Sequence, residues 1–466
     1  MYVNYKYLFL LFSILLSVIL SANDTQIDLR NIEEYQLENG MKILIAPNHE
    51  NPIVYIYAYI NAGEIDSPID KPNLAEFTFS TMKTGTKKYP KFDDIKSQLR
   101  NLGNENSDFV WYGMEEELSY IENYCMKKDT RECIEIIAEI LINPLLNTRQ
   151  YFWLKILEKF APKKMKLDND AVSSSHIYNM YANKEYNNNP DEWMSYNKKE
   201  VEKWYKEYIR PENITLMITG DINYIYIKKI IHEYFNNWNV NTPLPKRREY
   251  KTNLTSESGI KFRFINNDTM TDFAKTRIMT FAPSFKDDWF QAGSLAKVIM
   301  GNQNSGRISK LHALFDRSGY IYTWRNYRER MPYYGIYTNT KYSNLLKYYT
   351  EIRNEFSKFA SNSITKEELD IAKKFRINHY QNKFYNLESF SAITQEYYNQ
   401  GYSLEDISDI EKRINAVTLE EVNAAAKRMF NPDNFMMVIM GNKDSSATFL
   451  NQFKDYEYFE LTDEIK

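Results

Sequence analysis

The sequence of 466 residues is too long for one hydrophobic core of ordinary size, which predicts two or three domains. Its 59 basic and 62 acidic residues give a net charge of −3, without the basic excess by which proteins bind nucleic acids, so we expect no nucleic-acid partner. The composition is that of a globular protein, and we interpret the 38 tyrosines as core and surface residues rather than as a stacking site.

The N-terminus has the layout of a secretory signal peptide. Residues 1–7 include a lysine, residues 8–20 form an apolar run, and the small residues Ser21 and Ala22 follow. The apolar run is shorter than the stretch of about 20 residues that a membrane-spanning helix usually needs. We therefore expect residues 1–22 to be a signal peptide, cleaved after Ser21 or Ala22, and the protein to be periplasmic or secreted. Anchoring by an uncleaved signal segment is the alternative.

Only two cysteines, Cys125 and Cys133, are present. Their number excludes a framework of disulfides and argues against zinc binding by cysteine. Their spacing leaves both a single disulfide and two buried thiols open.

The chain contains an internal repeat with an offset of 221 residues. Asn197 and Thr418 each precede a Glu by three positions, as residues at helix N-termini do. The same offset relates the landmarks that follow each predicted helix: Pro211 to Pro432, Asn213 to Asn434, and Gly220 to Gly441. Applied further back, it brings the two strand-like runs after Gly40 close to those after Lys261.

We therefore predict an α+β protein of two tandem homologous α/β-sandwich units of about 220 residues each. Each unit is expected to run strand, strand, helices, strand, helix, strand, and a further helix is predicted from Thr365, with Glu368 at the capping-box position. The predicted domains are residues 23–242 and 255–466. Residues 243–254, rich in proline and charge, are the predicted linker.

The stretch "NLAEFTFSTMKTGTKKYP" begins like an amphipathic helix and ends in a turn-like segment. Helical spacing puts Glu76 and Ser80 on one face, one turn apart. Together with "NGMKILI", "AYINAGEIDSP" and the two-unit layout, this stretch resembles the insulinase/pitrilysin family of zinc peptidases. The resemblance covers nearly all of the chain after the signal peptide, and the chain looks like a bacterial-type member without the zinc motif.

Active members of that family carry an inverted motif, H-x-x-E-H, in which two His bind zinc and the Glu activates a zinc-bound water. If Gly85-Thr86 is aligned with the family's Gly-Thr, Glu76 takes the place of the first His, Phe79 that of the Glu and Ser80 that of the second His. Serine is a poor zinc ligand and phenylalanine cannot accept a proton. We therefore predict that the zinc site is lost, and that this chain has no catalytic or metal-binding residues of its own.

No replacement site is evident in the sequence. Glu158 lies near the place of the family's third ligand, a glutamate, although the alignment favours Lys159 there. The five histidines are scattered, and no two of them are spaced i, i+4.

Some members of the family act as pairs of one zinc-bearing and one degenerate subunit around a shared chamber. The degenerate subunit contributes an Arg and a Tyr to substrate binding, and the comparable segment "LFDRSGYIYTW" offers Arg317 and Tyr322. Phe315 stands where the family's Arg is expected, so Arg317 departs from the pattern by two positions. An Arg and a Tyr could hold a substrate backbone and polarise its carbonyl beside the partner's zinc.

The resemblance therefore predicts the non-catalytic subunit of an exported insulinase-like peptidase complex. It would form a heterodimer with a zinc-bearing subunit, bind no cofactor itself, and bind peptide or unfolded protein substrates. A structural or peptide-binding homologue without a protease role is the alternative, and an active metallopeptidase with atypical ligands is a further one.

Overall fold

The computed structural model describes residues 29–103, 111–152, 169–182, 196–247, 254, 259–302, 306–315, 321–326 and 329–461. The predicted signal peptide lies outside these residues. Within the described ranges, no helix combines the length and the apolar character needed to cross a bilayer.

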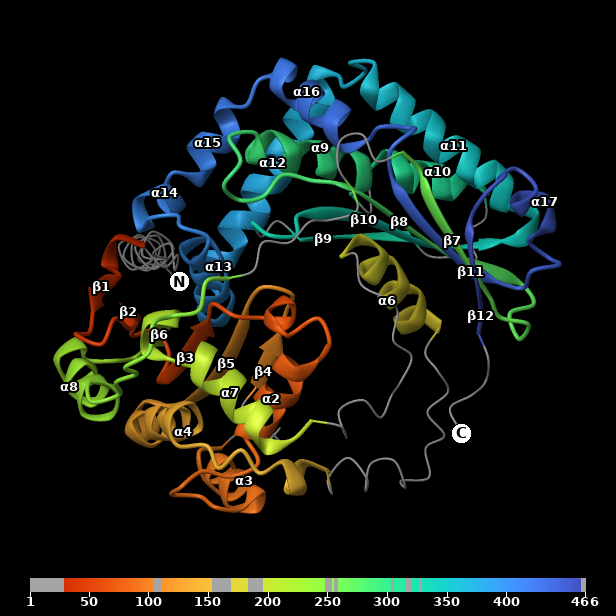
Figure 1. Ribbon diagram of the computed structural model, residues 1–466. Coiled ribbons are helices and arrows are strands. Elements are labelled where there is room, and N and C mark those ends of the chain that lie inside the picture. The colour runs from red at the N-terminus through yellow and green to blue at the C-terminus, as the bar shows by residue number, and fades with distance from the viewer. Residues whose placement is uncertain are drawn as a thin grey trace, which may run out of the picture.

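The first half of the chain contributes one six-stranded mixed sheet, shown with its helices in Figure 1. Its strands are β1 (Glu33–Gln36), β2 (Lys42–Pro47), β3 (Ile53–Ile60), β4 (Trp111–Met114), β5 (Ser119–Met126) and β6 (Ile214–Gly220). They lie in the order β1-β2-β6-β3-β5-β4, with β2 and β6 parallel and the other neighbours antiparallel. Strand β4 is therefore one edge of this sheet.

The second half repeats this arrangement. Its strands are β7 (Lys261–Asn266), β8 (Phe273–Phe281), β9 (Ile321–Asn326), β10 (Tyr333–Lys341), β11 (Met436–Gly441) and β12 (Glu457–Glu460). The order β12-β7-β11-β8-β10-β9 matches the order in the first sheet strand by strand. The exception is that β12, which follows the other strands in sequence, takes the place that β1 has in the first sheet. Each sheet thus has six strands, where the sequence predicted four per unit, and β9 is the edge that corresponds to β4.

The helices of the first half are α2 (Leu74–Met82), α3 (Phe92–Asn101), α4 (Thr130–Ile142), α6 (Asn169–Tyr181), α7 (Lys198–Tyr208) and α8 (Tyr224–Phe235). Those of the second half are α9 (Phe290–Gly301), α10 (Arg307–Phe315), α11 (Tyr342–Ala360), α12 (Lys366–Asn382), α13 (Leu387–Asn399), α14 (Leu404–Ser408), α15 (Ile410–Ala416), α16 (Leu419–Met429) and α17 (Ala447–Leu450). Short 3₁₀ helices are η1 (Leu29–Asn31), η2 (Glu64–Asp66), η3 (Lys127–Asp129), η5 (Pro211–Asn213) and η6 (Lys383–Tyr385).

The capping boxes predicted from the sequence are present. Asn197 caps α7, Thr418 caps α16 and Thr365 caps α12, each with a Glu at the third helical position that bonds back to the cap. Helices α7 and α16 begin and end at positions related by the 221-residue offset.

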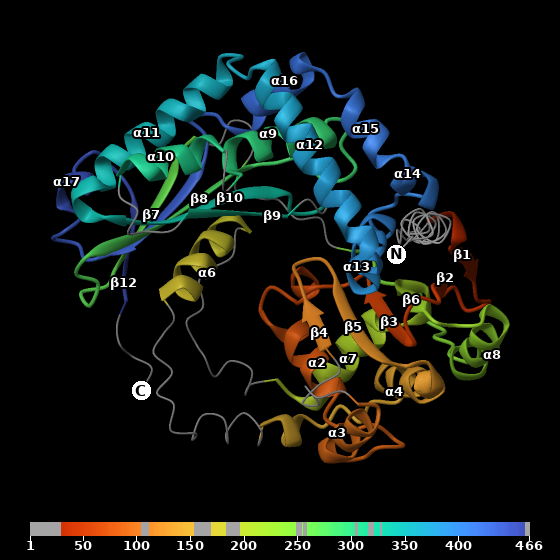
Figure 2. The same cartoon turned by 180° about the vertical axis from the view of Figure 1, so that it is seen from behind.

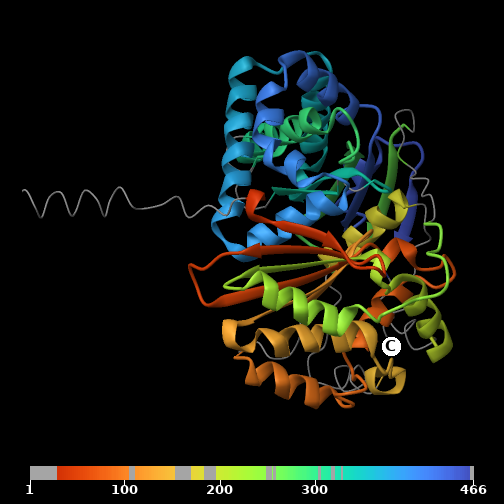
Figure 3. The ribbon, with the colours of Figure 1, turned by 90° about the vertical axis from the view of Figure 1, so that its left-hand side faces the viewer.

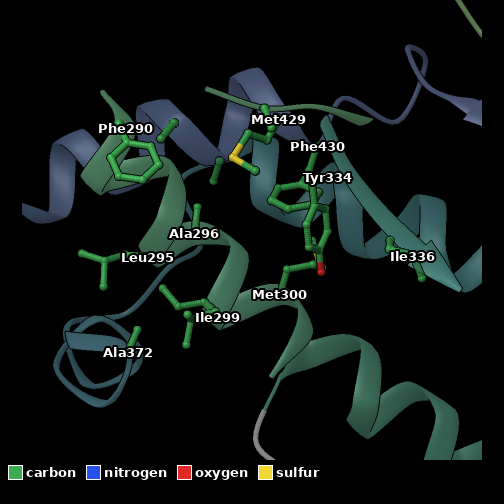
Figure 4. Close-up of a cluster of buried hydrophobic side chains, with 14 of the residues drawn as sticks. Phe290, Leu295, Ala296, Ile299, Met300, Tyr334, Ile336, Ala372, Met429 and Phe430 are labelled. Atoms are coloured by element: carbon green, nitrogen blue, oxygen red, sulfur yellow. The ribbon is translucent and has the colours of Figure 1, made fainter. Parts of the chain in front are cut away.

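The outer face of each sheet carries most of its own half's helices (Figure 2). Figure 4 shows part of the second core, where Leu295 and Ile299 of α9 belong to one cluster with Met429 of α16, Phe430 directly after it, and Tyr334 of β10. These side chains are at most 6% exposed, so this layer is a closed hydrophobic core.

The inner faces exchange one helix between the halves. Helix α6 of the first half packs on β8 and β11 of the second sheet, and α13 of the second half packs on β3 and β6 of the first (Figure 1). Ile177 and Met180 of α6 belong to one hydrophobic cluster with residues of β8 and β11. On the other side, Thr215 of β6 donates its hydroxyl to the side-chain oxygen of Asn399 of α13 at 2.9 Å. Figure 3 shows the result from the side, the second half stacked over the first sheet.

Candidate functional site

Helix α2 carries the residues that the sequence aligned with a zinc motif. Glu76 projects from its exposed face, and no hydrogen bond or ion pair of its carboxylate is found among the described residues. One turn on, Phe79 and Ser80 are 3% and 2% exposed, and Phe79 belongs to the hydrophobic core of the first half. The helix therefore presents one carboxylate, one core aromatic ring and one buried hydroxyl.

This donor set does not fit a catalytic zinc site, which needs three protein ligands and an open position. Across the described ranges, no three His, Cys, Asp or Glu side chains are grouped so that they could hold a metal ion. Glu158 and Lys159 lie outside the described residues. Cys125 on β5 and Cys133 on α4 are buried free thiols, and burial raises the pKa of Cys133.

The turn after α2 explains why the sequence reads Thr84-Gly85-Thr86 at this place. Thr86 donates its backbone N–H to the carbonyl of Tyr89 at 2.8 Å, which closes a tight turn. A Cβ added to Gly85 would meet the carbonyl oxygen of Pro90 at 2.5 Å, so only glycine fits this position. The residues used to set the alignment are therefore fixed by local geometry.

Tyr322, the predicted substrate-binding residue, lies on the edge strand β9 and is 38% exposed. Its ring stacks on that of Tyr337, the residue opposite it on β10, with centroids 4.3 Å apart. This cross-strand contact favours the side-chain rotamer of Tyr322 that keeps the two rings stacked. Arg317, the other predicted residue, lies outside the described residues.

A buried charge cluster joins the two halves beside α2. Arg330 donates to Asp66 from both terminal nitrogens, and Arg247 of the predicted linker donates to the other oxygen of Asp66 at 2.9 Å. Glu117 accepts the backbone N–H groups of Arg330 and Met331, each at 2.9 Å. Burial raises the pKa of Glu117, and the two arginines and two N–H groups oppose that shift.

A cavity of about 580 Å³ lies between the halves, and we call it the interface cavity. The first sheet forms one wall with Tyr57 and Tyr59 of β3 and Tyr120 and Glu122 of β5. In the strand register Tyr57 lies opposite Glu122, and Tyr59 opposite Tyr120. Because alternate residues of a strand share a face, these four side chains point the same way.

The opposite wall belongs to the second half. It includes Arg325 of β9, Lys383 of η6 and Glu388 of α13. The cavity is therefore present only because α13 crosses onto the first sheet. Its size is in the range of ligand-binding cavities, about 300–1,000 Å³.

This cavity was not predicted from the sequence, although a signal was present. Tyrosines recur at every second position along residues 55–59, and Tyr120, Glu122 and Tyr124 alternate in the same way. Polar aromatic residues on what should be the buried face of a strand indicate a wet or ligand-facing surface.

Comparisons with known proteins support the resemblance. The family model "Peptidase M16 inactive domain" matches residues 195–375. The curated "Probable zinc protease PqqL" of Haemophilus influenzae is 23% identical over 278 residues, which cover 52% of this chain but only 28% of that protein. The match thus spans little more than a quarter of this relative.

Solved structures match over more of the chain. A protease from Helicobacter pylori superposes with a TM-score of 0.75 at 14% identity, over 88% of this chain and 99% of that one. The first half of the periplasmic protease PqqL from Escherichia coli gives a TM-score of 0.69 at 16% identity, over 91% and 94%. The resemblance to the insulinase-like zinc peptidases is therefore confirmed: the chain has the fold of the M16 peptidases and carries a segment that matches their inactive domain.

Proposed function

We propose that this chain is the non-catalytic subunit of an exported insulinase-like peptidase, which binds peptide or unfolded substrates in a chamber shared with a zinc-bearing partner. The observation that carries the proposal is the side-chain set on α2. In the alignment on Gly85-Thr86, Glu76 and Ser80 take the places of the two zinc-binding His of an active member and Phe79 that of its general base, and the structure has these three side chains on one helix. Hydrolysis at a metal centre would then have to come from another chain.

Substrate binding is supported by the surfaces between the two sheets. Strands β4 and β9 are sheet edges, and an edge strand can pair with an extended peptide through backbone hydrogen bonds. Tyr322 lies on one of these edges, and the interface cavity contacts the turn that follows the other. Backbone pairing suits unfolded substrates, because it does not depend on their sequence.

Export is supported by the signal-peptide layout of residues 1–22 and by one of the structural relatives, which is described as a periplasmic protease. The nearly balanced charge of the chain agrees with a protein substrate rather than a nucleic acid. We propose a periplasmic or secreted heterodimer, with zinc held by the partner alone.

The first test is the zinc content of the purified chain after dialysis against trace zinc, measured by inductively coupled plasma mass spectrometry. The proposal expects well under one zinc per chain. One zinc retained per chain would contradict it and would favour a metallopeptidase with atypical ligands.

The second test is reconstitution with a homologue from the same genome that carries an intact H-x-x-E-H motif. We expect a complex of the two chains by analytical ultracentrifugation and faster cleavage of an unfolded substrate than by the homologue alone. Binding of peptides without any gain in cleavage would instead support the alternative, a peptide-binding homologue without a protease role.

A further inference from the structure

The interface cavity is acidic. Its lining includes five carboxylates: Glu115, Glu116, Glu122, Glu388 and Glu396. Among the described residues that line it, two are cations, Arg325 and Lys383. These residues give the cavity a net charge of −3, and a partly enclosed site of low dielectric strengthens the field of such charges.

The two cations belong to one side of the cavity. Burial lowers the pKa of His379, and repulsion from these two cations, Lys297 and Arg376 lowers it further, which places the basic groups near one another. Glu396 faces the same basic group, since it interacts with Lys297. The positive charges of the cavity thus lie beside Glu396. The other four carboxylates are neutralised less than the net charge of −3 suggests.

Two of them approach each other from opposite halves. Glu122 lies on β5 of the first sheet and Glu388 on α13 of the second half, and both line the cavity. Burial raises the pKa of Glu122, and repulsion from Glu388 raises it further. Tyr57 donates a hydrogen bond to Glu122, which occupies only part of its acceptor capacity. A cation between the two carboxylates would relieve their repulsion.

Tyr59 gives an independent indication of a ligand. Its side chain is 7% exposed and lines the cavity, and no hydrogen bond to its hydroxyl is formed among the residues that the structure describes. Because Tyr59 lines the cavity, its hydroxyl is available to accept a hydrogen bond from a donor of a bound ligand. The ring stacks on Tyr120 with centroids 5.5 Å apart and lies 6.2 Å from Tyr57, which forms an aromatic wall.

An ammonium or guanidinium group meets all three requirements. Its positive charge would offset the repulsion between the carboxylates of Glu122 and Glu388. It also donates hydrogen bonds to a tyrosine hydroxyl and binds favourably over aromatic rings. We propose that the interface cavity is a subsite for one basic side chain, lysine or arginine, of a bound peptide. This inference rests on the proposed function as a peptide-binding subunit.

A peptide side chain fits the site better than a free cation does. Glu115 and Glu116 form the turn directly after the edge strand β4, so the cavity adjoins the end of a strand that can pair with a peptide. Arg325 and Lys383 would repel a second nearby cation, so the subsite selects one basic residue next to a neutral or acidic one.

The test uses two fluorescent twelve-residue peptides that differ at one position, lysine in one and norleucine in the other, and measures binding to the full chain by anisotropy. We expect the lysine peptide to bind about tenfold more tightly, which equals about 1.4 kcal/mol. The double variant Glu122→Gln/Glu388→Gln should lose this preference and keep its affinity for the norleucine peptide. The control Glu367→Gln/Glu420→Gln removes two exposed carboxylates from the outer helices α12 and α16 and should keep the preference.

Glu388→Lys supplies a second readout, because Glu388 is exposed on α13 and its replacement leaves the core intact. This variant should weaken the lysine peptide and strengthen a matched peptide with glutamate at the same position. Equal binding of the lysine and norleucine peptides to the wild type, or a preference that survives in the double variant, would overturn the inference and leave the proposed function standing.

Binding of neither peptide would overturn both proposals. Spermidine, titrated separately, carries ammonium groups without a peptide backbone. Tight binding of spermidine with no preference for the lysine peptide would assign the cavity to a free polyamine and overturn the inference.

Discussion

Asp66 of the first half and Arg330 of the second form an ion pair across 264 residues of sequence, with both terminal nitrogens of the arginine 2.9 Å from one carboxylate oxygen. The Asp66 side chain is 1% exposed, and its second oxygen accepts from Arg247 and from the backbone N–H of Gly63. One carboxylate thus connects the first half, the segment between the halves, and the second half.

Replacement of this carboxylate should loosen the junction. Asp66→Asn leaves two arginines close together without their shared anion, and removal of one partner of a buried pair costs about 3–5 kcal/mol. We expect a lower thermal midpoint by differential scanning calorimetry. The control Asp288→Asn, at an exposed position, should change stability by less than about 0.5 kcal/mol. Equal midpoints for Asp66→Asn and the wild type would show that the charge cluster does not contribute to the free energy of unfolding.

The exchanged helix α6 should be sensitive to acid. His176 on α6 is 2% exposed and contacts Arg263 of the second sheet, and burial together with that arginine lowers its pKa to about 3. Between the ordinary histidine pKa of about 6.5 and that value, the unfolded chain binds a proton that the folded chain does not. The contribution of His176 to the free energy of unfolding is therefore fully present above pH 6.5. Below that pH it falls as the pH falls, by at most about 1.4 kcal/mol per pH unit.

We expect the thermal midpoint to fall between pH 7.5 and pH 5, and amide hydrogen exchange in α6 to accelerate. His176→Gln should reduce the difference between the two pH values, because the titrating group is gone. His232→Gln, at an exposed position on α8, serves as the control and should keep the wild-type difference. If His176→Gln lost as much stability on acidification as the wild type, the pH sensitivity would have to come from other groups.

Local signals in the sequence predicted local structure well. The caps Asn197, Thr365 and Thr418 are side chains that bond backbone groups two or three residues away, so each sequence motif contains its own structural reason. The additional strands were not predicted, because β4 is four residues long and β1 has the polar sequence EEYQ. Short edge strands carry little of the alternating pattern on which strand prediction relies.

The relations between the halves could not be predicted in the same way. Helix α6 has no pronounced apolar face, since Ser173 and His176 are buried on the same side as Ile177, so its sequence indicates neither that the helix is buried nor which sheet covers it. Glu122 and Glu388 are likewise ordinary charged residues until α13 crosses onto the first sheet. The alignment placed Glu76, Phe79 and Ser80 on one helix, and only the packing around α2 distinguishes the exposed carboxylate from its two buried neighbours.

Restoring ligands on α2 tests the alignment itself. Glu76→His/Ser80→His creates the i, i+4 histidine pair of the family motif, and we expect its zinc dissociation constant to fall by about tenfold or more relative to the wild type. Adding Phe79→Glu completes the motif, but it places a carboxylate in the hydrophobic core and should lower the thermal midpoint. Competition with a zinc-sensitive dye measures the affinity. No gain in either variant would mean that the helix is aligned in the wrong register.

The hydroxyl of Tyr322 can be tested without disturbing the strand. Tyr322→Phe keeps the ring stacked on Tyr337 and removes only the polar group, so the thermal midpoint should stay unchanged. In the reconstituted pair that we propose, loss of one hydrogen-bond donor to the reacting carbonyl should lower kcat/KM by about a hundredfold. Tyr226→Phe on the outer helix α8 is the matched control and should leave kcat/KM unaffected. Full activity of Tyr322→Phe would mean that the exposed ring serves only the strand pair, and that the substrate carbonyl is polarised by other groups.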